Sequence, residues 1–255
     1  MLQIQPGYRD YEEWAAFAQR EGLFYEALAV SMPPLLCGGG EAAPYCDKLR
    51  ASGRLRSLHG AFIDIDPASG DDDMRALSRR RCAESCALAV SLGAENVVFH
   101  SSCFPFLRGA FFEKWADECA TFYQSLAQTY GLRIFIENSM DVDPQPLAAL
   151  MRRISDKRIG VCLDFGHANY SRVPVRSWFE ALGGRIGYLH LSDNAGAFDD
   201  HLPLGDGSID WEEADSLRKS LGRDVPMTLE VGGIDGVARS LRYMRERGLF
   251  GYGGD

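Results

Sequence analysis

The chain has 255 residues, of which 46% are hydrophobic and 25% charged, as in an ordinary globular protein. Its formal net charge of −9 offers no general attraction to nucleic acid or to an anionic membrane. The sequence contains no run of apolar residues long enough for a membrane span and no signal-peptide pattern. Seven cysteines without a C-x-x-C pair indicate reduced thiols, so we expect a cytoplasmic protein.

Short apolar runs of strand type alternate with longer segments of helical period along the whole chain. The predicted strands cover residues 2–5, 23–30, 57–63, 96–100, 133–137, 159–164, 186–191 and 226–231. The predicted helices cover residues 11–21, 73–92, 112–126, 147–154, 175–182, 211–221 and 235–247. Residues 31–56, with Pro33, Pro34 and the glycines at 38–40, are predicted to form a long loop that contains a short helix.

This strict alternation of strands and helices leaves few architectures. A doubly wound open sheet would usually bring a glycine-rich phosphate turn after its first strand. The glycines at 38–40 do not supply that turn, because no helix opens directly on them. No linker, composition break or tandem repeat divides the chain. We therefore predict a closed (β/α)8 TIM barrel of class α/β, which forms a single domain over residues 1–255.

The third predicted strand carries a histidine, and carboxylates and imidazoles stand at the ends of the five later strands or beyond them. In chain order they are His59, His100, Glu137, Asp164, His167, His190, Asp199, His201 and Glu230. All five histidines of the chain belong to this set. Because the carboxyl ends of barrel strands converge on one small volume, these side chains would need a cation to neutralise and pair them. The pattern therefore predicts a metal site.

Taken singly, several of these residues have a simpler structural explanation. His59 or His100 alone could be a hydrogen-bonded core histidine, and Asp164 could cap the helix that follows it. Asp199 could be a solvated loop residue. Glu230 is harder to explain in this way, because a buried glutamate almost always has a partner.

The order of these motifs resembles the xylose isomerase-like TIM-barrel superfamily, and within it the sugar phosphate isomerase/epimerase group. The motifs that carry the resemblance are Val-Val-Phe-His100, Ile-Glu-Asn138, Gly-Val-Cys-Leu-Asp-Phe-Gly-His167, Leu-His-Leu-Ser-Asp193, His201-Leu-Pro-Leu-Gly-Asp-Gly-Ser-Ile-Asp210 and Leu-Glu230. They cover about residues 57–232, whereas the first 50 residues share only the strand–helix rhythm.

The resemblance implies one divalent ion held by four residues from late strands, which are Glu137, Asp164, His190 and Glu230. It also implies that Glu137 and Glu230 are catalytic, since they would remove and return a proton on carbon through a metal-stabilised enediolate. The same superfamily includes endonuclease IV-like apurinic-site nucleases with a multi-zinc centre. Their additional ligands have candidates here, which could instead bind substrate: His59, His100, His167, Asp199 and His201.

We favour a divalent-metal-dependent sugar or sugar phosphate isomerase/epimerase, with the nuclease as the alternative. A nuclease needs a basic surface around the mouth, and the loops after the fifth and seventh predicted strands are acidic or neutral. A non-catalytic sugar-binding barrel would be expected to lack one of the four ligands. The ligand types suit Mn, Mg, Co or Zn. The expected partner is a small sugar or sugar phosphate, with no nucleic acid and no membrane, and a homo-oligomer is left open.

Overall fold

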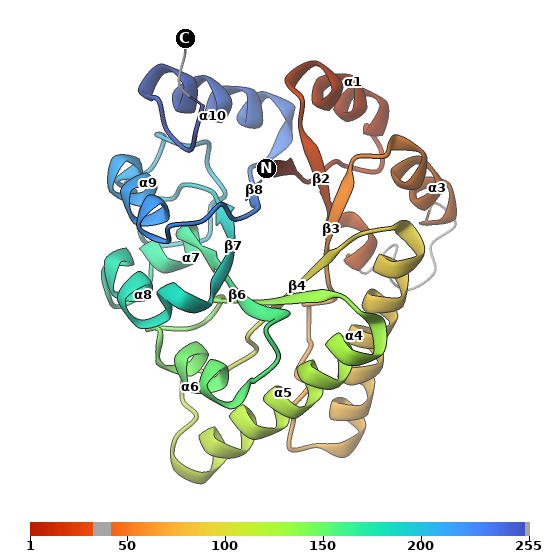
Figure 1. Cartoon of the computed structure of the whole chain (residues 1–255), viewed down its shortest axis with the longest axis vertical. Coiled ribbons are helices and arrows are strands. Elements are labelled where there is room, and N and C mark those ends of the chain that lie inside the picture. The colour runs from red at the N-terminus through yellow and green to blue at the C-terminus, as the bar shows by residue number, and fades with distance from the viewer. Residues whose placement is uncertain (33–41, 253–255) are drawn as a thin grey trace.

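The computed structural model describes residues 1–32 and 42–252. Eight parallel strands form one closed barrel in the order β1 to β8, and helices surround it (Figure 1). The strands are β1 (Leu2–Ile4), β2 (Phe24–Ala27), β3 (Leu55–His59), β4 (Asn96–His100), β5 (Arg133–Glu137), β6 (Ile159–Asp164), β7 (Ile186–Leu191) and β8 (Met227–Leu229). The predicted (β/α)8 TIM barrel is confirmed.

The helices lie outside the ring of strands, and their apolar faces pack on it. They are α1 (Tyr11–Glu21), η1 (Ala29–Ser31), α3 (Ala42–Ser52), α4 (Asp72–Leu92), α5 (Gly109–Tyr130), α6 (Gln145–Arg153), α7 (Phe165–Asn169), α8 (Val175–Leu182), η2 (Gly183–Arg185), α9 (Trp211–Ser220) and α10 (Gly233–Arg247). Within the described ranges, no helix is both long and apolar enough to cross a membrane.

Several predicted boundaries need correction. β2 ends at Ala27, because the chain turns into the 3-10 helix η1. β3 begins earlier than predicted and ends at His59, after which the chain leaves the sheet and the backbone amide of Ala61 binds the Ser85 hydroxyl. The bounds of the short helix α7 were not predicted, since five residues are too few to show helical periodicity. The loop prediction for residues 33–41 lies outside the described residues.

Two layers of inward-facing side chains fill the barrel, because alternate residues of a strand point to the same face. The lower layer includes a small apolar cluster of Val98, Phe135, Cys162 and Tyr188. Gly187 makes room for the Phe135 ring, since a Cβ atom there would lie 2.6 Å from it. Two positions further along the same four strands stand the polar residues of the upper layer, which are His100, Glu137, Asp164 and His190. The apolar cluster is therefore a floor beneath the polar layer.

Candidate metal centre and active site

Four side chains from neighbouring strands converge above this floor. Strand register places Asp164 beside His190, and the backbone amide of Glu230, just past β8, still donates to the Leu191 carbonyl at 3.0 Å. Ligand atoms of Glu137, Asp164, His190 and Glu230 all lie within 4.8 Å of one another. This is the four-residue group predicted from the strand ends.

The Nδ1 atom of His190 stands among three carboxylates. It lies 2.8 Å from Glu230 Oε2, 3.4 Å from Glu137 Oε2 and 4.0 Å from Asp164 Oδ2. None of these four atoms has a hydrogen-bond partner within the described residues, although all are buried. Buried polar atoms without partners are rare in native proteins, so their convergence on one point fits a bound cation.

The pKa shifts of the buried groups in the cluster also bear on whether it could hold a cation. Burial raises the pKa of Asp164 to about 6 and lowers the pKa of His100 to about 4. Burial is the largest cause of both shifts, whereas His190 outweighs burial at Glu230 and lowers the pKa of that carboxyl to about 2. A divalent ion would offset the charge of the carboxylates, and a neutral imidazole is the form of histidine that ligates metals. The donor set is thus able to hold a metal ion.

A second group shares Glu137. His59 Nε2 lies 3.4 Å and His100 Nε2 3.9 Å from Glu137 Oε2, and the three residues form another cluster with metal-ligand spacing. His59 is the last residue of β3 and is buried, while His100 ends β4 beside Glu137 in the sheet register. The structure therefore brings both predicted histidines to the site.

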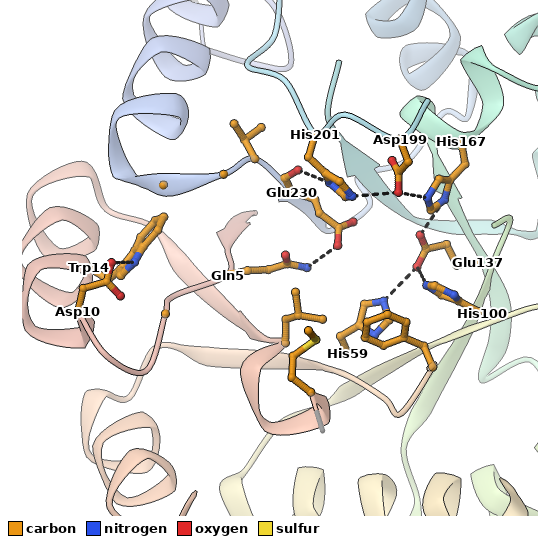
Figure 2. A pocket seen from close by; sticks show the side chains of 17 residues that line it. Gln5, Asp10, Trp14, His59, His100, Glu137, His167, Asp199, His201 and Glu230 are labelled. Carbon is orange, nitrogen blue, oxygen red and sulfur yellow. Dashed lines mark hydrogen bonds and ion pairs between the residues drawn. The ribbon is translucent and has the colours of Figure 1, made fainter. Parts of the chain in front are cut away.

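The remaining predicted residues form a chain across the mouth of the barrel (Figure 2). Asp199 Oδ2 lies 3.1 Å from both His167 Nε2 and His201 Nε2. His167 Nδ1 donates to the Asn138 carbonyl at 2.7 Å and faces Glu137, whereas His201 Nδ1 donates to the Glu230 carbonyl at 2.8 Å. Asp199 is therefore not simply a solvated loop residue.

Asp193 fixes the loop that carries Asp199 and His201. Its backbone exchanges two hydrogen bonds with Leu202, at 2.8 and 2.9 Å. Its carboxylate, fully buried, accepts hydrogen bonds from backbone amides further along the loop and from Trp211 Nε1 at 2.8 Å. The backbone of His201 adopts a positive φ of 48°, which is uncommon for a residue with a side chain and is held here by the surrounding contacts.

Asp164 caps a helix, as the structural explanation expected, and its second carboxylate oxygen also faces the metal-ligand cluster. Its Oδ1 atom accepts a hydrogen bond from the His167 amide at 2.5 Å and so caps α7. Its Oδ2 atom is the one that faces the metal-ligand cluster. The Asn138 side chain also bridges β5 and β6, because it donates to the Asp164 carbonyl and accepts from the Asp164 amide.

Sequence reasoning missed Glu26, which lies fully buried in β2 on the far side of His190. Its Oε2 atom accepts hydrogen bonds from His190 Nε2 at 3.1 Å, Tyr188 at 2.7 Å and Thr228 at 3.0 Å. Because Nε2 carries the proton in this arrangement, Nδ1 is left free to face the carboxylates. A lone glutamate inside an otherwise apolar predicted strand was the available signal.

Gln5 was also missed, although it ends the first predicted strand. Its side-chain amide donates to Glu26 Oε1 at 2.9 Å and to Glu230 Oε1 at 3.1 Å. Gln5 thus connects Glu26, which accepts from His190 Nε2, with Glu230, which faces His190 Nδ1. No periodicity distinguishes this glutamine, because the predicted strand is too short to show an alternation.

A cavity of about 490 Å³ opens above the cluster toward the β1–α1 and β8–α10 loops (Figure 2). Trp14 and Phe62 are its aromatic lining residues. Phe165 and Trp211 pack on each other in the core and Phe104 is exposed beside another cavity, so these three aromatic residues do not line it. None of the described lining residues is a lysine or an arginine.

The sequence matches a known protein family over most of its length. The family model described as "xylose isomerase-like TIM barrel" matches residues 45–247. The chain belongs to this family. The predicted resemblance is confirmed at this level.

Relatives that resemble the chain have different names. An uncharacterised protein of Methanocaldococcus jannaschii, MJ1311, is 27% identical over 200 residues, which are 74% of this chain and 68% of the relative. A probable endonuclease 4 of Mycobacterium leprae is 28% identical over 216 residues, or 79% of this chain and 82% of that protein.

Solved structures with the same fold include a D-tagatose 3-epimerase-like protein, with a TM-score of 0.78, 24% identity and 96% of each chain covered. The TTHB071 protein of Thermus thermophilus, in a crystal soaked with ZnCl2, has a TM-score of 0.80 and 27% identity, with 100% of this chain and 99% of that chain covered. Proteins with different names therefore share one barrel, and the choice of chemistry depends on the site.

Proposed function

We propose that the protein is a divalent-metal-dependent sugar isomerase or epimerase. The observation that carries this proposal is the pair of carboxylates on β5 and after β8, Glu137 and Glu230, which meet at the base of one deep cavity. The names of structural neighbours, among them L-ribulose 3-epimerase at 17% identity and the D-tagatose 3-epimerase-like protein, accord with it. Transfer of a proton at carbon needs such a pair around the substrate.

In this proposal the ion is held by Glu137, Asp164, His190 and Glu230. A bound divalent ion would act as a Lewis acid and offset the negative charge that develops on the substrate oxygens. Mn, Mg, Co and Zn all accept oxygen and imidazole donors. The zinc-soaked crystal of the Thermus relative makes zinc a natural first choice for loading.

The chain's own residues would perform the proton transfer. One of Glu137 and Glu230 removes the proton from the carbon next to the carbonyl, and the other returns a proton to the same or the neighbouring carbon. Glu137 is fully buried and ends β5, whereas Glu230 is slightly exposed and borders the cavity from β8. Because each carboxylate has two oxygen atoms, one oxygen can face the ion while the other faces the substrate.

The histidines at the mouth would bind the hydroxyl groups of the substrate. Asp199 holds His167 and His201 in fixed orientations, and both imidazoles line the cavity. His59 and His100 lie on the other side of Glu137. They would either bind substrate hydroxyl groups as well or form a second metal site together with Glu137. The enclosing floor keeps water from reaching the reacting carbon from below.

The direct test is proton exchange at carbon. Zinc- or manganese-loaded protein would be incubated with a panel of ketoses, aldoses and their phosphates in deuterium oxide, and the products followed by NMR. We expect at least one sugar to gain deuterium at a carbon next to its carbonyl as its isomer or epimer appears. If the whole panel remained unlabelled with every metal, the proposed chemistry would be wrong.

The endonuclease-like alternative rests on a specific observation as well. Every predicted ligand of a multi-zinc centre lies in the cavity or its base, including the bridged pair of His167 and His201. Metal analysis of protein purified without added ions distinguishes the two functions. About one ion per chain favours the isomerase, whereas two or three zinc ions with cleavage of abasic-site DNA would establish the nuclease.

Replacing Glu26 with Gln should weaken metal binding. The neutral amide no longer polarises the Nε2–H group of His190, and loss of such a partner typically costs about 10- to 100-fold in metal affinity. Calorimetric titration of apo protein with zinc measures the change. Glu13→Gln, an exposed change on α1, is the matched control. Equal affinities in the two variants would show that Glu26 does not orient the imidazole.

Other expectations from the sequence stay proposals. They are the single domain over residues 1–255, the cytoplasmic location, the small-molecule partner and the absence of nucleic acid as a ligand. The described cysteines are all free thiols, which accords with a reducing compartment.

A further inference from the structure

Cys162 belongs to the apolar floor of the barrel, yet it lies within reach of the metal-ligand cluster. It is fully buried in β6, where the strand register pairs it with Glu137 of β5 and where it stands two residues before Asp164. Ligand atoms of Glu137, Cys162 and His190 all lie within 4.8 Å of one another. The floor therefore offers the centre a sulfur atom beside the oxygen and nitrogen atoms of the predicted ligands.

A buried cysteine usually serves only as a small apolar residue. Cys162 does so in part, because it packs with Val98, Phe135 and Tyr188. Among the residues that the structure describes, however, no other thiol belongs to a group of three with metal-ligand spacing, although Cys119, for example, is buried to the same extent. Its place beside two ligand residues distinguishes Cys162 from the other buried thiols.

The group that contains the thiol and the group of four predicted ligands share Glu137 and His190. Both carboxylate oxygens of Glu137 and the Nδ1 atom of His190 lack hydrogen-bond partners within the described ranges, so they are available to an ion. Asp164 and Glu230 complete an upper position for that ion, and Cys162 completes a lower one. Because one imidazole nitrogen binds only one ion, the two positions are alternatives.

The two positions differ in the softness of their donor atoms. The upper position has three carboxylates and one imidazole, which suit hard ions such as magnesium and manganese. The lower position has sulfur in place of two of the carboxylates, and thiolates are soft donors that favour thiophilic ions. A coordinating thiol gives its proton to the solvent as the metal–sulfur bond forms, so binding needs no further reactant.

We infer that a thiophilic ion such as cadmium binds in the lower position with Cys162 as a ligand, whereas manganese binds in the upper one. Zinc accepts oxygen, nitrogen and sulfur donors and can use either position. An ion in the lower position leaves Asp164 and Glu230 without a direct bond to it. Cys162 is then a metal-selecting ligand, and the position of the ion does not depend on which reaction the protein catalyses.

The test uses cadmium alone as the probe. Apo protein with one equivalent of an NMR-active cadmium isotope would be examined by cadmium NMR, in which a sulfur donor shifts the resonance strongly downfield. We expect a downfield resonance and an ultraviolet sulfur-to-cadmium charge-transfer band from the wild type, which needs no variant to be informative. Cys162→Ala should lose both signals. Cys119→Ala, which removes an equally buried thiol from α5, should keep both.

Calorimetric titration separates a ligand from a residue that only shapes the floor. We expect Cys162→Ala to weaken cadmium binding by at least about tenfold, because even loss of a partner outside the ligand set typically costs about 10- to 100-fold. Manganese binding should not change. Equal losses for both ions would overturn the inference, and so would a wild-type cadmium spectrum without a sulfur donor or one that persists in Cys162→Ala.

The outcome of these measurements is separate from that of the deuterium experiment. Sulfur-bound cadmium without carbon exchange on any sugar would support the lower position while refuting the proposed reaction. Carbon exchange with manganese, together with a cadmium spectrum that lacks a sulfur donor, would support the reaction while refuting the role of Cys162.

Discussion

Replacing Glu230 with Gln is expected to reduce turnover of a confirmed sugar substrate by about 100- to 10,000-fold, the range for loss of a general acid or base. Gln has the same shape, so the hydrogen bond from Gln5 to the Oε1 position can persist. The variant loses the charge that faces His190 Nδ1 at 2.8 Å and the group proposed to carry the proton. Steady-state rates by NMR or a coupled assay would measure the effect.

The matched control for this variant is Glu246→Gln, an exposed glutamate on the outer surface of α10. It makes the same chemical change on the helix that follows Glu230, and we expect wild-type turnover. Circular dichroism should show that both variants keep the fold. Substantial activity of the Glu230 variant on a confirmed substrate would contradict the two-carboxylate mechanism.

Removal of the metal should lower the melting temperature by roughly 5–15 °C. A ligand present at about 100 to 1,000 times its dissociation constant stabilises the native state by about 3–4 kcal/mol, and 1 kcal/mol corresponds to about 2–4 °C in a chain of this size. Stripping the ion leaves Glu137, Asp164 and Glu230 buried within one small volume without neutralisation. Differential scanning calorimetry before and after chelation, with metal content checked, would measure the shift.

A double variant, Glu137→Gln with Asp164→Asn, gives this experiment its control. It removes two ligands and two charges together, so its melting temperature should no longer respond to the chelator. An unchanged melting temperature in the wild type after verified metal loss would mean that the ion is not coupled to folding.

Much of the candidate site could be predicted because the relevant information is local. A barrel strand shows where it ends, since its apolar run stops at a polar residue, as at His100 and Glu137. Parallel strands in a closed barrel bring those ends together whatever the details of packing. The convergence of His59, His100 and His190 therefore followed from the strand pattern, whereas His167 lies in α7 and His201 in the loop after β7.

The parts that escaped prediction depend on contacts across the barrel. Glu26 on β2 meets His190 on β7, and no property of either local sequence indicates that pairing. The position of the loop that carries Asp199 and His201 depends on Asp193, whose carboxylate binds Gly205 and Trp211 further along the chain. Local patterns thus predicted the ligands, while the residues that orient them and shape the outer cavity required the structure.

The hydrogen bond between Gln5 and Glu230 joins residues 225 positions apart, and β1 pairs directly with β8. Contacts of such long sequence separation form late in folding, because a long loop must close before they are gained. The four ligand residues stand on consecutive strands, β5 to β8, so they can come together before the barrel seals. Glu26 and Gln5 reach them across the β1–β8 seam, so sealing the barrel is the step that gives His190 and Glu230 their hydrogen-bond partners.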